Sequence, residues 1–216
     1  LNHIRVHQAN GIDYLQQMDK VGCLFLDPAR RDGNGGKTVA ISDCEPDVCR
    51  LEPLLVEKGD VVMVKLSPML DMASALNDLK HVRQVHVVSV NNECKELIIL
   101  LKKPNEAGNC VDNEKTIVCE QVVNNSASQH FSYTLSEEKN AVCTIADKVG
   151  TYLYEPGAAL PKAGPYKLLS ARYGVGKLHP NSHLYTSAQA VDFPGRCFRV
   201  IAVSGFGKKE LKDFMK

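Results

Sequence analysis

The sequence LFLDPARRD at residues 24–32 places a short apolar run directly before an aspartate and a proline. The apolar residues 23–26 are too few for a helix and are typical of a strand buried in a parallel sheet. Pro28 lacks a backbone N–H and has a fixed φ angle, so a strand ladder cannot continue through it. The segment therefore predicts a buried strand at residues 23–26 that ends at Asp27.

Similar apolar runs recur on both sides of this strand, with helical patterns between them. We expect strands at residues 4–6, 61–64, 85–90 and 97–101, and helices at residues 11–18, 47–58 and 71–79. This alternation predicts an α/β fold in which helices pack on a parallel sheet. The polar residues 91–96 join the last two strands, so we expect an antiparallel hairpin at one edge of the sheet.

The pattern changes after residue 102. Residues 103–115 contain Pro104, Gly108 and several Asn, which is typical of a linker. Short strands are expected at 116–123, 130–135 and 142–146, followed by a helix near 166–173, a strand at 197–203 and a last helix from Lys208. The sequence therefore predicts three units, at residues 1–102, 113–148 and 152–216, of which the last two are small accessory domains.

Composition restricts the partners and the environment of the chain. Its 26 Lys and Arg residues and 25 Asp and Glu residues give a formal charge of +1, so any RNA contact must use a local patch. No apolar run approaches roughly 18 residues, and no basic stretch leads into an apolar signal core. We therefore expect a cytoplasmic protein without a membrane contact.

The number and spacing of the cysteines indicate reduced thiols rather than disulfide bonds or metal ligands. Eight Cys are sparse in a chain of 216 residues that is rich in Val, Ile and Leu. Cys44 and Cys49 lie close together in sequence, but no other Cys or His pair has compact ligand spacing. No metal site is expected.

Polar residues follow three of the expected strands. In open α/β sheets the ligand crevice lies at the carboxyl ends of the strands, where Asp27 and Pro28 would stand. The strand at 61–64 ends in Lys65, Leu66, Ser67 and Pro68, and a third strand ends in residues 91–96. We therefore predict a catalytic site that contains Asp27, Pro28, Lys65 and Ser67. The alternative is that Asp27 and Pro28 only form a turn after a strand.

Four ordered motifs, at residues 26–32, 42–47, 65–71 and 92–97, resemble those of a known family. The chain is similar to a bacterial family of class I S-adenosylmethionine-dependent methyltransferases with a C-terminal THUMP-like domain. Segments of the tail support this resemblance, at residues 154–157, 162–164, 183–186 and 193–196. The resemblance covers nearly the whole chain.

The resemblance implies a fold, a cofactor and a substrate. Residues 1–102 would be the C-terminal half of a Rossmann-like methyltransferase core, residues 113–148 a ferredoxin-like unit and residues 152–216 a THUMP-like domain. S-adenosylmethionine would be the methyl donor and RNA the substrate. Asp27 would hold the acceptor, as the acid does in the acid-Pro-Pro-aromatic signature of amino-methylating enzymes. Ala29 and Arg30 replace the second proline and the aromatic residue, which removes the usual stacking platform for a flipped base.

The Asp-Pro-Ala-Arg sequence also resembles a motif of RNA uridine C5-methyltransferases. Those enzymes need a Cys nucleophile after the next strand, where this chain has Lys65, Leu66, Ser67 and Pro68. Without a thiolate, attack on a pyrimidine ring carbon lacks its covalent step. We therefore expect methylation of a nitrogen or an oxygen atom.

The glycine loop of the cofactor site is not found in this sequence. The strand order of the superfamily is 3-2-1-4-5-7-6, in which residues 4–6 would be strand 3 and residues 23–26 strand 4. Of the cofactor contacts, Asn10, Gly11 and Asp27 remain. The resemblance implies a fragment that lacks the two strands between, so we expect residues 4–6 to lie apart from 23–26. We also expect self-association through the exposed sheet edge.

Basic residues offer candidate phosphate contacts. Residues 33–38, GNGGKT, end like a phosphate-binding loop, but the required first glycine is Arg31 and a strand-like segment follows. A substrate-binding loop with Arg30, Arg31 and Lys37 fits better. Arg196 either binds phosphate or bridges a turn to a carboxylate.

Three functions remain open at this point. The first is an RNA methyltransferase fragment, which by itself would be inactive. The second is a non-catalytic RNA-binding or interaction module with a degenerate methyltransferase core. The third is a small-molecule methyltransferase, against which the basic pair Arg30 and Arg31 and the accessory domains argue.

Overall fold

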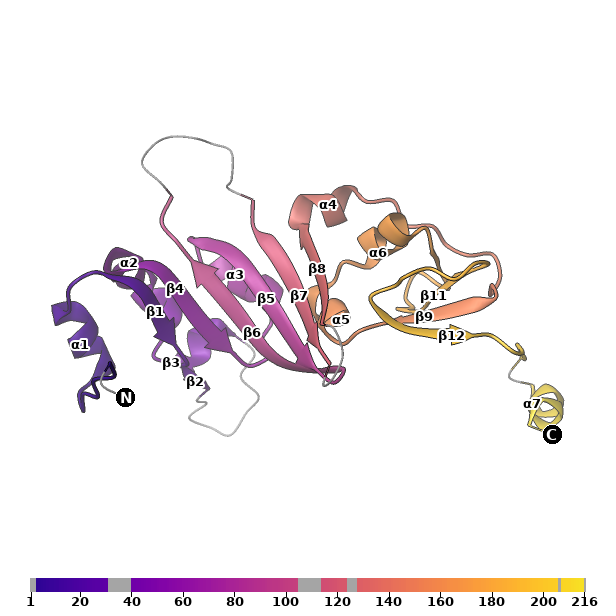
Figure 1. Cartoon of the computed structure of the whole chain (residues 1–216), viewed down its shortest axis with the longest axis horizontal. Helices are drawn as coiled ribbons and strands as arrows, with labels where there is room; N and C mark the ends of the chain where they lie inside the picture. Colours follow the sequence, from indigo (N-terminus) through magenta and orange to yellow (C-terminus); the bar gives the residue numbers. More distant parts are fainter. Residues whose placement is uncertain (1–2, 31–39, 105–113, 124–127, 206, 216) are drawn as a thin grey trace.

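The computed structural model describes residues 3–30, 40–104, 114–123, 128–205 and 207–215. It contains a six-stranded core sheet, a four-stranded sheet and a two-stranded sheet. In Figure 1 the core sheet and the four-stranded sheet lie at the two halves of an elongated molecule, and the last helix stands apart at the carboxyl terminus. The predictions for Arg31 and Lys37 lie outside the described residues.

The core sheet has the order β1-β4-β6-β5-β7-β8. Its strands are β1 (Val21–Leu26), β4 (Gly59–Leu66), β5 (Val82–Val90), β6 (Glu93–Leu101), β7 (Thr116–Val122) and β8 (Gln129–Thr134). β1 runs parallel to β4 and β5 runs parallel to β7, whereas β6 is antiparallel to both β4 and β5. The segment β1-β4-β6-β5 thus has the arrangement 4-5-7-6 that the resemblance implied. The predicted α/β class is confirmed.

One face of the core sheet is buried under helices. Val62, Val64 and Leu66 of β4 are buried, while Met63 and Lys65 on the alternate face are half-buried. The first three helices are α1 (Gly11–Gln17), α2 (Val48–Lys58) and α3 (Met72–Asp78). α2 packs on β1 and β4. These helices follow the predicted ranges closely.

Each of these helices begins at a polar capping residue. Asn10, Asp47 and Asp71 each accept two backbone N–H groups of the first turn. Such a cap stabilises a helix by roughly 1 kcal/mol because it satisfies donors that have no partner within the helix.

Between β1 and α2 lie β2 (Ala29–Arg30), the 3-10 turn η1 (Ile41–Asp43) and β3 (Cys44–Glu45); β2 and β3 pair antiparallel.

The expected hairpin is present. Asn91 and Asn92 both have positive φ angles, 49° and 62°. A two-residue turn of this kind matches the twist of antiparallel strands, and Asn tolerates the left-handed conformation. The turn reverses the chain between β5 and β6, so it brings residues 91–96 to the carboxyl edge of the core sheet.

The strands that follow residue 115 differ from their expected placement. β7 pairs with β5, and β8 pairs with β7, so both belong to the core sheet and not to a separate sheet at 113–148. The apolar side chains Ile117, Cys119 and Phe131 are buried with those of the core, which explains why these strands join it. No strand forms at 142–146, where a single bridge joins Ile145 to Lys177.

The C-terminal unit contains an antiparallel sheet with the order β10-β11-β9-β12. Its elements are β9 (Tyr152–Pro156), α5 (Ala159–Ala163), α6 (Tyr166–Tyr173), β10 (Gly176–Lys177), β11 (Tyr185–Ser187), β12 (Gly195–Arg199) and α7 (Lys208–Phe214). The short helix α4 (Leu135–Asn140) precedes them and has a capping box at Thr134. Tyr154, Tyr185 and Phe193 form an aromatic core. α5 packs against β5, β6 and β7, so the unit is attached to the core sheet.

Residues 4–6 do not form the expected strand. Ile4 and Val6 are exposed, and neither pairs with β1. An apolar pattern of three residues cannot hold a strand without a neighbour, since a ladder needs a partner for its N–H and C=O groups.

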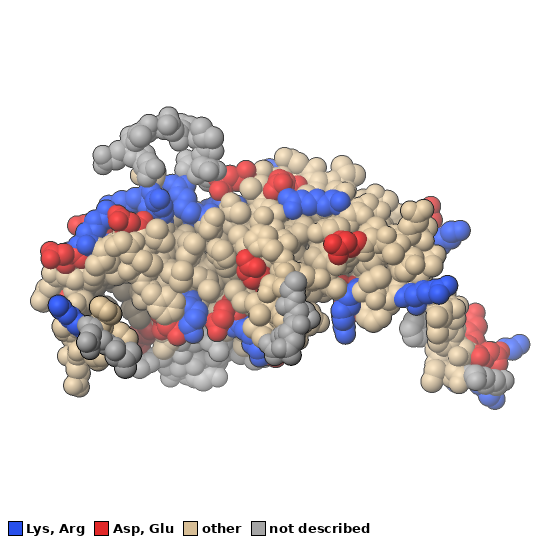
Figure 2. Space-filling view, in the orientation of Figure 1, with Lys and Arg blue, Asp and Glu red and all other residues tan. Residues whose placement is uncertain are grey.

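Among the described residues, no helix has the length and hydropathy to cross a membrane. Figure 2 shows Lys, Arg, Asp and Glu side chains interspersed over the visible face.

Candidate functional site at the carboxyl edge of the core sheet

Asp27 and Lys65 form an ion pair at the carboxyl ends of two parallel strands. Asp27 directly follows β1, and Lys65 is the next-to-last residue of β4. The Lys65 Nζ atom lies 2.7 Å from Oδ2 of Asp27 and 3.9 Å from Oε2 of Glu96 on β6. Charged side chains at the ends of three neighbouring strands therefore meet here, which is the convergence that the sequence predicted for Asp27 and Lys65.

The pair is accessible. The side chains of Asp27 and Lys65 are 56% and 32% exposed. The hydrogen bond to Asp27 raises the pKa of Lys65 above its usual range, and Glu96 acts in the same direction. Lys65 therefore stays charged over the neutral range. A carboxylate has about four lone-pair sites, so Asp27 keeps acceptor capacity beyond its bond to Lys65.

Pro28 and Ser67 shape the backbone around this pair. Pro28 is buried, whereas Asp27 directly before it is exposed. Ser67 Oγ accepts the Met69 N–H, and the Ser67 carbonyl accepts the Leu70 N–H. Both residues lie at the predicted edge. Ser67 uses its hydroxyl to form a turn, which orients the loop between β4 and α3.

The C-terminal unit contacts this edge at two points. Asn92 Oδ1 accepts the Ala158 N–H at 2.9 Å, and Lys162 Nζ donates to the Leu70 carbonyl at 2.6 Å. Leu70 belongs to the loop that starts at Ser67. Asn92 and Lys162 thus hold the loop and the hairpin against α5. No local spacing pattern could predict these contacts, because the paired residues lie 66 and 92 positions apart.

Asn10 and Gly11 lie at the amino end of α1. Asn10 Oδ1 accepts the N–H groups of Ile12 and Asp13 at 2.9 and 3.3 Å. Gly11 is exposed, and a Cβ atom at this position would meet nothing within 4 Å. Asn10 therefore acts as a helix cap, and its role in cofactor binding stays a prediction.

Among the predicted phosphate contacts, Arg196 has a described side chain, and it lies on β12 of the C-terminal unit. The backbone of Arg30 forms part of β2, close to Asp27 in the chain. Arg196 of β12 forms an ion pair with Glu155 of β9, and its guanidinium lies 5.6 Å from the centre of the Phe198 ring. Of the two roles considered for Arg196, the structure contains the carboxylate contact.

The thiols near the core are poor nucleophiles. Cys94 on β6 has a raised pKa because it is partly buried, although Lys162 acts in the opposite direction. Burial raises the pKa of Cys49 to about 11 and that of Cys119 to about 12. Within the described ranges, no group of three or more His, Cys, Asp or Glu side chains is arranged to hold a metal ion.

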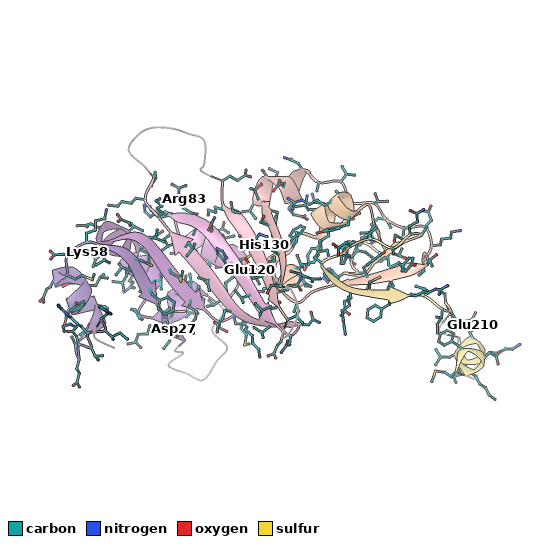
Figure 3. All side chains as sticks on the ribbon, in the orientation of Figure 1. Asp27, Lys58, Arg83, Glu120, His130 and Glu210 are labelled. Carbon is teal, nitrogen blue, oxygen red and sulfur yellow. The ribbon has the colours of Figure 1, made fainter. Side chains whose placement is uncertain are left out.

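A histidine cluster on β5, β7 and β8 was not predicted. His130 Nδ1 lies 2.9 Å from Oε1 of Glu120, and His86 Nε2 lies 3.4 Å from Oε1 of Gln84. Figure 3 shows Glu120 and His130 on neighbouring strands, away from Asp27 at the lower end of the core sheet. The residues come from three strands, so only the strand register brings them together.

Comparisons with known proteins add two findings. A family model described as a ferredoxin-like domain matches residues 152–194, whereas the sequence assigned the ferredoxin-like unit to 113–148 and a THUMP-like domain to 152–216. The chain is also similar to the crystal structure of a proposed methyltransferase from Porphyromonas gingivalis W83, with 35% identity and a TM-score of 0.77. The match covers 89% of this chain and 46% of that one, so the chain spans about half the length of that protein. Comparison with curated proteins finds no match.

Proposed function

We propose that this chain is part of an S-adenosylmethionine-dependent methyltransferase that modifies a nitrogen or oxygen atom of RNA. The observation that carries the proposal is the Asp27–Lys65 pair at the carboxyl edge of a sheet with the order β1-β4-β6-β5. This edge is where open α/β sheets bind their ligands. The similarity to the proposed methyltransferase from P. gingivalis W83 supports the same class of reaction.

Asp27 would position the acceptor. An exposed carboxylate accepts a hydrogen bond from an amino or hydroxyl group and so fixes the direction of its lone pair. Lys65 would hold the carboxylate in place through its 2.7 Å contact. Ser67 and Pro28 would keep the two flanking turns rigid. S-adenosylmethionine, when bound, supplies the methyl group that the acceptor attacks.

The residues of this chain fit only the border of a cofactor site. Asn10 and Gly11 are exposed at the start of α1, and Asp27 is exposed after β1. No Gly-x-Gly-x-Gly loop occurs in the 216 residues. Binding of the donor therefore requires groups beyond these residues. We propose that the 216-residue chain alone does not catalyse methyl transfer.

A nitrogen or oxygen acceptor is favoured over a ring carbon. Methylation of a pyrimidine carbon needs a thiolate that adds to the ring. Cys94 belongs to the hairpin at the carboxyl edge, and burial raises its pKa, so it stays a thiol at neutral pH. A positioned acceptor requires only the carboxylate of Asp27.

RNA is the proposed substrate because the carboxyl edge is attached to an accessory unit. Asn92 and Lys162 join the edge to α5, and the four-stranded sheet follows directly. An accessory sheet fixed beside a reaction site is suited to hold a long substrate. A small-molecule acceptor would not require this contact.

Calorimetry with S-adenosylmethionine tests the first half of the proposal. The ligand is titrated into the 216-residue chain and into a form extended at its amino terminus through a glycine loop. Binding by the extended form alone is the expected result. If neither form binds, the methyltransferase proposal fails and a non-catalytic RNA-binding module becomes the better account. Replacing Asp27 by Ala separates the two, since RNA binding survives in both and turnover is lost only in an enzyme.

Self-association through β1 is a further part of the proposal. β1 lies at the edge of the core sheet, and Phe25 on it is 59% exposed. Edge strands with exposed apolar side chains pair readily with another chain. Analytical ultracentrifugation should show a dimer for the unaltered chain and a monomer for Phe25→Lys. A monomer at all concentrations contradicts this part.

A further inference from the structure

Five basic residues gather at the end of the core sheet opposite Asp27. They lie where β4 and β5 begin and where β6 ends, and we call them the basic edge: Lys58, Lys80, Arg83, Lys102 and Lys103. The strand register brings them together. Leu101 pairs with both Val62 of β4 and Val82 of β5, and the Lys102 N–H donates to the His81 carbonyl at 2.9 Å.

The basic edge faces solvent. Lys80, Lys102 and Lys103 are exposed, while Lys58 and Arg83 are half-buried and Lys58 Nζ donates to the Met18 carbonyl at 2.7 Å. Figure 2 shows Lys and Arg side chains along this end of the core sheet, with Asp and Glu side chains between them, and Figure 3 places Lys58 and Arg83 there, at the opposite end from Asp27.

Neighbouring carboxylates offset part of this charge. Asp60 of β4 is paired with Lys20 at 2.6 Å. Glu52 is 4% exposed and accepts the N–H groups of Lys80 and His81, so its carboxylate is buried and hydrogen-bonded within the protein. Glu57 on α2, Asp78 at the end of α3 and Glu114, two residues before β7, are exposed and offset some of these cations. The exposed lysines Lys80, Lys102 and Lys103 nevertheless lie at adjacent strand ends, in a chain whose formal charge is only +1.

We propose that the basic edge binds the phosphate backbone of a nucleic acid strand. Lys and Arg side chains at a water-exposed edge are the usual partners of phosphate oxygens, and they release counterions when they bind. An anionic membrane is a poorer partner, because interfacial binding also needs exposed apolar side chains beside the charges. The apolar residues nearest this edge, Leu79, Val82 and Leu101, are buried.

The positions of the basic edge and of Asp27 define the path that a bound RNA strand would take across the protein. β4 connects the two ends, from Lys58 just before it to Lys65 near its end. At roughly 3.3 Å per residue this is a separation of about 23 Å, which corresponds to about seven stacked nucleotides at roughly 3.4 Å each. This step rests on the proposed RNA substrate: the RNA that places its acceptor at Asp27 also contacts the basic edge, whereas RNAs of about four nucleotides do not reach it.

Fluorescence anisotropy with a labelled single-stranded RNA of about twelve nucleotides tests the inference. The 216-residue chain is compared with Lys102→Gln/Lys103→Gln and with a control, Lys148→Gln/Lys212→Gln. The control removes the same charge from exposed lysines of the C-terminal half. Affinity is measured between about 50 and 200 mM salt, since the salt dependence reports the number of phosphate contacts.

The basic-edge variant should bind the RNA roughly tenfold more weakly, and its slope of log affinity against log salt should fall by about 1.4, or roughly 0.7 per lost contact. The control should stay within about twofold of the unaltered chain. Equal losses in both variants, or no binding of RNA by the unaltered chain, overturn the inference. Tighter binding to phosphatidylserine vesicles than to RNA, lost in the same variant, also overturns it.

The same measurement separates this inference from the proposed function. Loss of RNA binding in the basic-edge variant upholds the inference even if no methyl transfer is found in the extended form. Methyl transfer to RNA by the extended form, unchanged by the same two substitutions, upholds the function and contradicts the inference.

Discussion

Glu52 and Asp27 lie at opposite ends of the core sheet, and the two carboxylates differ in burial and in their hydrogen bonds. Glu52 on α2 is 4% exposed and accepts bonds from the Lys80 and His81 N–H groups and from His81 Nδ1. Asp27 is 56% exposed and forms an ion pair with Lys65. A buried carboxylate with several donors fixes the fold, whereas an exposed one with spare acceptor capacity is free for a ligand.

Replacement of Glu52 should cause the largest loss of stability. In Glu52→Ala two backbone N–H groups and the His81 ring lose their acceptor in a buried place, so we expect a loss of about 3 kcal/mol. Urea unfolding followed by circular dichroism measures it. Glu57→Ala, on the exposed side of the same helix, is the control and should change stability by less than about 0.5 kcal/mol. A similar loss in both variants would mean that the buried carboxylate of Glu52 stabilises the fold no more than an exposed carboxylate does.

The attachment of the C-terminal unit should give the next largest effect. Tyr133 on β8 is 2% exposed, and its hydroxyl donates to the Ala163 carbonyl of α5 at 2.6 Å. Tyr133→Phe leaves that buried carbonyl without its donor, so a loss of about 1–2 kcal/mol is expected in thermal unfolding. The exposed Tyr14 provides a control, Tyr14→Phe, which should unfold at the temperature of the unaltered chain.

Removal of the charge of Asp27 should hardly affect stability. Exposed ion pairs contribute roughly 0–1 kcal/mol, so Asp27→Asn should unfold within about 1 kcal/mol of the unaltered chain in urea. Lys65→Gln is the matched change on the other side of the pair. A loss above about 2 kcal/mol in either variant would mean that the pair holds the fold, and the contrast with Glu52 would disappear.

His86 should produce a small dependence of stability on pH. Burial lowers its pKa below the usual value of 6.5, with Glu120 acting in the opposite direction. The unfolded chain then binds a proton at a higher pH than the folded chain does, so stability falls as the pH drops below about 6.5. His86→Gln should flatten this decline, and His3→Gln, at an exposed position, should not. An NMR titration midpoint of His86 above 6.5 would contradict the assignment.

Much of the core sheet could be predicted from the sequence because the signals are local. Apolar runs give β1, β4, β5 and β6 within a few residues, and the Asn pair marks the hairpin. The convergence of Asp27 and Lys65 follows from the rule that parallel strands end at one edge. Long-range contacts carry no such signal. The pairing of β7 with β5, the contacts of Asn92 and Lys162, and the donors around Glu52 depend on register and packing.

The strand expected at residues 4–6 shows that a local signal alone can be wrong. Ile4 and Val6 have the right residue types, yet a strand forms only where a neighbour accepts its hydrogen bonds, and none of the described strands does so. The ferredoxin-like match at 152–194 likewise depends on how short strands pair, because β10 and β11 span only two and three residues.

The decisive test of the proposed function is methyl transfer from radiolabelled S-adenosylmethionine to cellular RNA. The form extended through a glycine loop is compared with its Asp27→Asn variant. We expect the first to transfer methyl groups to RNA. The Asp27→Asn variant should do so at a rate roughly a hundredfold lower and with unchanged RNA affinity, because the acceptor is no longer positioned. Transfer at the same rate by both forms, or no transfer to any RNA by the unaltered form, would contradict the proposed function.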